Sequence, residues 1–107
     1  MIDIANDVLD RELAGSVTIV IAASEPEPVR VQVEKRWREL LAAFSSGIAH
    51  VDTPDDPRLP GWESKLAAVR HYRFEFITFD DPVPTDATLV YAIGEPPPNW
   101  SVPAIRA

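Results

Sequence analysis

A histidine and several carboxylates gather between residues 50 and 65, in the segment HVDTPDDPRLPGWESK. Asp55 follows a proline, and Glu63 precedes Lys65 by two positions. Two carboxylates that hold a divalent metal, with a lysine that orients the attacking water, would suit a metal-dependent nuclease. That chemistry needs the second acid and the lysine to alternate on a strand. Here they open the stretch WESKLAAV, which is typical of a helix, so we interpret the segment as an acidic loop.

A second metal-binding arrangement would use both histidines. His50 and Asp52 alternate at the end of a short predicted strand, Asp55 or Asp56 lies nearby, and His71 would join them across the sheet. Histidine and carboxylate ligands suit iron, zinc or manganese. A small metal-dependent hydrolase using His50, Asp52 and Asp55 is therefore the alternative function. Two histidines without a fixed short spacing are more typical of structural or solvated side chains, so we predict no cofactor.

Covalent and nucleotide chemistry have little support. The chain contains no cysteine, which excludes thiol nucleophiles, zinc-thiolate sites and disulfides. No serine lies in a G-x-S-x-G turn, and the four glycines are scattered rather than gathered in a phosphate-binding loop. These features favour a protein that acts by binding over an enzyme.

The net charge of -7 restricts the partners that the chain would attract. Residues 1–13 and residues 80–107 each sum to about -3, whereas the middle of the chain is nearly neutral. A surface of this sign repels a phosphate backbone, so direct nucleic-acid binding is disfavoured. It attracts a basic protein surface.

No apolar run approaches the ~20 residues that span a bilayer, and the acidic N-terminus lacks the basic region of a signal peptide. Absent cysteine agrees with a reducing compartment. We therefore expect a cytoplasmic, microbial protein with no membrane association. A chain of 107 residues can bury a core as one domain.

Hydrophobic periodicity predicts the order α–β–α–β–(α)–β–β. Helical spacing of Ile2, Ala5, Leu9 and Leu13 predicts a short first helix. The continuous apolar run 17–23 is typical of a strand buried on both faces at the centre of a sheet. An apolar stripe from Val29 to Phe44 predicts one long helix that ends at Gly47, and residues 48–51 would then form a short strand.

Two further strands are predicted near the C-terminus. In HYRFEFITF, aromatic residues alternate with Arg73 and Glu75, and TLVYAIG follows after the turn-rich segment DDPVPTDA. We expect these two strands to form an antiparallel hairpin. An open edge at 71–79 or 88–94 would permit a homodimer through a continuous sheet.

The predicted fold is an α+β two-layer sandwich over residues 1–94, with one long helix packed on a small mixed sheet of three or four strands. Residues 95–107 form a proline-rich tail, which favours polyproline II and is expected to continue neither a sheet nor a helix.

From these features we predict a protein–protein interaction module, such as an inhibitor, an immunity or antitoxin-like protein, or an accessory subunit. Acids would meet a basic partner surface, and two tryptophans would serve as aromatic anchors. The residues expected to contact the partner are Asp55, Asp56, Trp62, Asp80, Asp81, Asp86 and Trp100.

Overall fold

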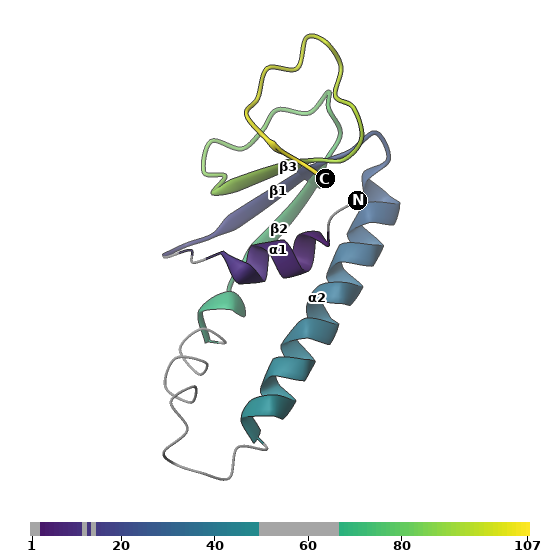
Figure 1. Ribbon diagram of the computed structural model, residues 1–107. Helices are drawn as coiled ribbons and strands as arrows, with labels where there is room; N and C mark the ends of the chain where they lie inside the picture. Colours follow the sequence, from purple (N-terminus) through teal and green to yellow (C-terminus); the bar gives the residue numbers. More distant parts are fainter. Residues whose placement is uncertain (1–2, 12, 14, 50–66) are drawn as a thin grey trace.

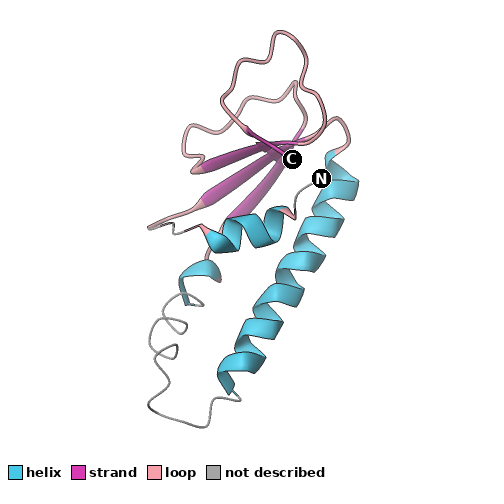
Figure 2. Cartoon of the chain, viewed as in Figure 1, coloured by secondary structure: helices cyan, strands magenta, loops and turns pink. Residues whose placement is uncertain are grey.

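The computed structural model describes residues 3–11, 13, 15–49 and 67–107. They form a small mixed helix/strand domain with one parallel four-stranded sheet (Figures 1 and 2). The elements are α1 (Ile4–Asp10), β1 (Thr18–Ala22), α2 (Pro26–Ala49), β2 (Arg73–Ile77), β3 (Leu89–Ala92) and β4 (Ile105–Arg106).

The sheet is built around β1. The strand order is β2-β1-β3-β4, and each neighbouring pair is parallel. Ile19 of β1 lies opposite Phe74 of β2 on one side and Leu89 of β3 on the other. All five residues of β1 are buried, as expected for an apolar strand of a parallel sheet. The prediction of a strand buried on both faces inside the sheet is confirmed.

The predicted antiparallel hairpin is wrong. β2 and β3 do not pair with each other, because they lie on opposite sides of β1 and both run parallel to it. The connection of residues 78–88 crosses β1 and runs from the end of β2 back to the start of β3. At about 3.3 Å per residue it is long enough to run the length of the five-residue strand β2. Alternation of side chains identifies a strand but carries no information on its direction, so the periodicity of β2 and β3 did not distinguish a hairpin from a crossover.

The long helix α2 follows its predicted apolar stripe. Val33 and Trp37 are buried, and Val29, Leu40 and Leu41 pack against the core. The predicted end at Gly47 is wrong, because α2 runs through it to Ala49. A single glycine costs a helix only about 1 kcal/mol, which the remaining turns tolerate. The strand expected from residue 48 is therefore wrong for residues 48–49, and residues 50–51 lie outside the described residues.

The two helices lie on one face of the sheet (Figure 1). Ile19, Ile21 and Tyr91 point to that face and join one core cluster with residues of α1 and α2. Trp37 of α2 packs on β2, with its ring centroid 5.1 Å from that of Phe74 in an edge-to-face arrangement. The predicted short first helix is confirmed by α1, which buries Ala5.

The other face of β1 is also buried. Val20 and Ala22 alternate with Ile19 and Ile21, and both have an exposed fraction of 0%. A connection between parallel strands is right-handed in nearly all proteins. Because α2 joins β1 to β2 across the first face, a right-handed return from β2 to β3 takes residues 78–88 across the second.

The end of the chain belongs to the sheet. Ile105 and Arg106 form β4, which lies opposite Tyr91 and Ala92 of β3, and the Ala107 amide donates to the Ala92 carbonyl at 3.0 Å. The expectation that residues 95–107 continue no sheet is therefore wrong at this point. β3 thus lies between β1 and β4, which pairs with Tyr91 and Ala92, whereas β2 lies at an edge of the sheet beneath Trp37.

A hydrogen bond from the Tyr91 hydroxyl connects β3 to α1. Tyr91 has an exposed fraction of 0%, and its hydroxyl donates to Asp7 Oδ2 at 2.5 Å. Arg11 Nε donates to the same oxygen at 3.1 Å. The hydrogen bond from Tyr91, followed by the Arg11 guanidinium, lowers the pKa of the Asp7 carboxyl below its ordinary value of 3.8, although partial burial opposes this. Burial and the bond to Asp7 raise the pKa of Tyr91.

Replacing Tyr91 with phenylalanine should lower the free energy of unfolding by about 1–2 kcal/mol, because the charge-assisted bond to Asp7 is lost. Urea unfolding followed by circular dichroism would measure this. Tyr72→Phe is the matched control: its hydroxyl lies 3.4 Å from the Leu13 carbonyl, so its loss should cost under about 0.5 kcal/mol. Equal losses in the two variants would contradict the assigned role of Tyr91.

The Asp7 carboxylate should also make stability depend on acid. Its pKa is lower in the folded chain, so its contribution is complete above the unfolded pKa and is lost as the pH falls through the folded pKa. Between about pH 5 and about pH 3 the wild type should therefore lose more stability than Asp7→Asn, which carries no titrating group there. Parallel curves of unfolding free energy against pH would rule out this contribution.

Candidate functional site

Acidic residues in three connections lie at the same end of the sheet. Parallel strands end at the same edge, so the residues that follow β1, β2 and β3 are brought together there. Glu25 and Glu27 follow β1, Asp80 and Asp81 follow β2, and Glu95 follows β3. All five are exposed. We call these five residues the carboxyl edge, because they lie at the carboxyl-terminal ends of the strands and not along an outer strand.

Few cations offset this charge. Arg30 forms hydrogen bonds with Glu27 and lies 3.6 Å from Glu34, so it is engaged by α2 itself. These bonds lower the pKa of Glu27. Among the residues that the structure describes, no cation lies within ion-pair distance of Glu25, Asp80 or Glu95. Their charges face solvent.

The two aspartates after β2 have different local roles. Asp81 Oδ2 accepts hydrogen bonds from the Thr78 amide at 2.9 Å and from its hydroxyl at 3.0 Å. The Asp80 amide donates to the Thr78 hydroxyl at 3.3 Å. Asp81 therefore closes the turn, and the carboxylate of Asp80 extends into solvent.

An aromatic pair lies beside these acids. Phe79, at the start of the β2–β3 connection, and Trp100, in the β3–β4 connection, meet edge to face with ring centroids 5.3 Å apart. Both are half-buried. The Trp100 amide donates to the Pro97 carbonyl at 3.0 Å, which holds the tryptophan in a turn. The pair joins the two connections and leaves part of each ring accessible.

The structure does not bring all the predicted acids together. Asp86 precedes β3, and the neighbouring Thr88 amide donates to the Thr18 carbonyl at the start of β1. Asp86 therefore lies at the amino-terminal ends of the strands, whereas Asp80 and Asp81 lie at the carboxyl-terminal ends. This separation follows from the direction of β3, which the alternation of side chains in the sequence does not predict.

The metal alternative gains no support from the described residues. His71 is exposed, in a turn closed by its amide and the Ala68 carbonyl at 3.2 Å. Within residues 3–11, 13, 15–49 and 67–107 no three His, Cys, Asp or Glu side chains are grouped to hold a metal ion. The remaining predicted site residues lie outside the described residues: His50, Asp52, Asp55, Asp56, Trp62, Glu63 and Lys65.

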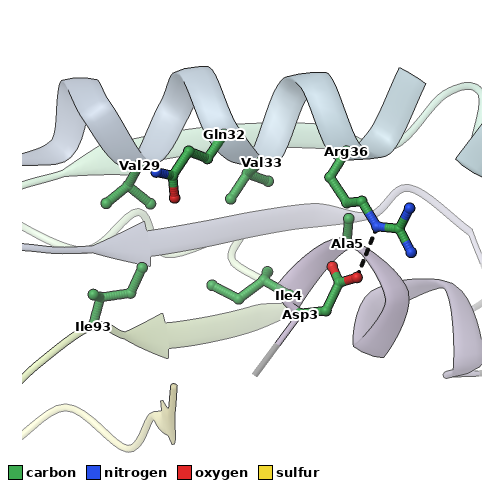
Figure 3. Close-up of a pocket in the computed structure, with 8 residues that line it drawn as sticks. All are labelled: Asp3, Ile4, Ala5, Val29, Gln32, Val33, Arg36 and Ile93. Carbon is green, nitrogen blue, oxygen red and sulfur yellow. Dashed lines mark hydrogen bonds and ion pairs between the residues drawn. The ribbon is translucent and has the colours of Figure 1, made fainter. Parts of the chain in front are cut away.

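A small cleft opens between the two helices and the end of β3 (Figure 3). Its volume is about 210 Å³. At one end Arg36 Nε lies 2.8 Å from Asp3 Oδ2, a contact that raises the pKa of Arg36. The lining residues are Asp3, Ile4, Ala5, Val29, Gln32, Val33, Arg36 and Ile93. The cleft was not predicted from the sequence, because these residues come from three distant segments and share no motif.

No protein-family model, curated protein or solved structure matches this chain. In the described part of the chain, no helix is both long and apolar enough to cross a membrane.

Replacing Asp81 with alanine should loosen the turn after β2, because the Thr78 amide loses its acceptor. We expect a loss of about 1 kcal/mol in the free energy of unfolding and faster proteolytic cleavage between residues 78 and 88. Asp80→Ala is the control, since its carboxylate closes no turn. If both variants behave alike, Asp81 does not hold this turn.

Proposed function

We propose that this chain is a cytoplasmic protein-binding module that docks onto a basic surface of a partner protein through its carboxyl edge. The observation that carries the proposal is the convergence of Glu25, Asp80 and Glu95 from three separate connections onto one edge. Such convergence follows from the parallel sheet and produces a local negative potential larger than that of any one loop.

The aromatic pair supplies the apolar part of such an interface. Binding energy at protein interfaces concentrates in a few aromatic and arginine side chains that a polar rim surrounds. Phe79 and Trp100 are already ordered by their mutual contact, so little side-chain entropy would be lost on binding. The partner would place apolar side chains on this pair and lysine or arginine near the acids.

Electrostatic attraction would act mainly on the association rate. An inhibitor or immunity protein that covers a basic functional surface has this chemistry, and a nucleic-acid ligand does not. The alternative function, a metal-dependent hydrolase, has no arrangement of described residues in its favour.

A pair of charge-matched variants would test the proposal. The edge variant Glu25→Gln/Asp80→Asn/Glu95→Gln removes three exposed charges at the carboxyl edge, and the control Asp10→Asn/Glu39→Gln/Asp86→Asn removes three exposed charges elsewhere. In both variants each new side chain has nearly the same size as the one that it replaces. Wild type and both variants would be immobilised, and lysate of the source cells passed over each at about physiological salt.

We expect one stoichiometric protein to stay on the wild type and the control and to be lost from the edge variant. With the purified partner, the association rate should fall about tenfold or more for the edge variant and should also fall with rising salt. Trp100→Ala should speed dissociation instead. Equal retention by the edge and control variants, or no retained protein, would refute the proposal.

A further inference from the structure

The cleft lies where open parallel sheets commonly bind small molecules. Ligands of such sheets sit beyond the carboxyl ends of the strands, where the outgoing connections diverge to opposite sides. Here β1 leads through α2 to β2 on one side, whereas β3 leads to β4 on the other. Val29 lies in the first turns of α2 and Ile93 directly follows β3, so the cleft is beside this point of divergence (Figure 3).

The two ends of the cleft differ in chemistry. Aliphatic side chains of Val29, Val33, Ile4 and Ile93 line most of it, with the Gln32 carboxamide beside Val29. Asp3 and Arg36 place one carboxylate and one guanidinium at its other end (Figure 3). An aliphatic body with both a positive and a negative group would match this arrangement.

The size of the cleft restricts the ligand further. About 210 Å³ is less than the 300–1,000 Å³ typical of drug-sized sites. One small molecule with a branched aliphatic side chain would fill it.

We propose that this cleft binds an aliphatic α-amino acid. The ammonium would pair with the Asp3 carboxylate, the ligand carboxylate with the Arg36 guanidinium, and the side chain would lie against Val29 and Val33. The ion pair between Asp3 and Arg36 would be exchanged for two ion pairs with the ligand, so neither charge would lose a partner. No step of this proposal depends on the carboxyl edge or on a protein partner.

Both charged residues are partly exposed, with side-chain exposed fractions of 41% for Asp3 and 46% for Arg36. Solvent therefore screens the ion pairs, and the aliphatic contact contributes much of the affinity. A dissociation constant of roughly 0.1–1 mM is the expected range for a ligand of this size.

Methyl NMR of the full chain would test the site directly, with L-leucine as the probe. Two truncated analogues separate the charges: 4-methylpentanoate lacks the ammonium, and 3-methylbutylamine lacks the carboxylate. Leucine should shift the methyl signals of Val29, Val33, Ile4 and Ile93 in a saturable titration. Each analogue should bind about tenfold more weakly than leucine, because one charged group then lacks a partner.

Two variants assign the charges to their residues. Asp3→Asn keeps an N-cap acceptor for α1, whose Asn6 amide now bonds Asp3 Oδ1 at 3.3 Å. It should weaken leucine about tenfold and strengthen 4-methylpentanoate, because the Asp3 carboxylate is no longer left unpaired beside the ligand carboxylate. Arg36→Gln should weaken both. Lys35→Gln, at an exposed position next to Arg36 in the sequence but outside the cleft lining, should change neither.

Three results would overturn the proposal: no methyl shifts at about 20 mM leucine, well above the expected dissociation constant; analogues that bind as tightly as leucine; or leucine affinity unchanged in both Asp3→Asn and Arg36→Gln. A failure here would leave the capture experiment on the carboxyl edge unaffected, because the edge and control variants retain both Asp3 and Arg36.

Discussion

The burial of β1 on both faces is the constraint on which the rest of the structure depends. Ile19, Val20 and Ile21 are fully buried, so the strand needs cover above and below and a paired strand on each side. The two helices cover one face, and β2 and β3 supply the flanking strands. The connection from β2 to β3, residues 78–88, crosses the second face. Among the described residues, α1 and α2 on one face and a strand on each side thereby enclose β1.

The parallel direction of the strands then determines what lies at each edge. Three connections that are far apart in sequence begin at the same edge, and they carry Glu25, Asp80 and Glu95. The start of α2 and the residue after β3 are brought to the same region, where they line the cleft with the N-terminus of α1. The acidic edge and the cleft are thus consequences of one topology, although they present different chemistry.

Sequence periodicity predicted the elements better than their arrangement. The apolar run of β1 and the stripe of α2 are dense enough to identify a buried strand and an amphipathic helix, and both are confirmed. Strand direction was predicted wrongly, because alternating side chains look the same in both directions. β4 was missed because two residues after a proline-rich segment carry no periodic signal. Of the predicted site residues, Asp80 and Asp81 lie together, whereas Asp86 lies at the other edge because β3 runs parallel to β2.

The most direct test of this account is a set of inter-strand nuclear Overhauser effects in the labelled chain. The parallel sheet predicts contacts of the backbone of Ile19 with both Phe74 and Leu89, and contacts of Tyr91 with Ile105. It also predicts no backbone-to-backbone contacts between residues 73–77 and residues 89–92, which β1 separates. Close Hα–Hα contacts between those two segments, the signature of an antiparallel pair, would contradict the topology and, with it, the convergence of the acids and the position of the cleft.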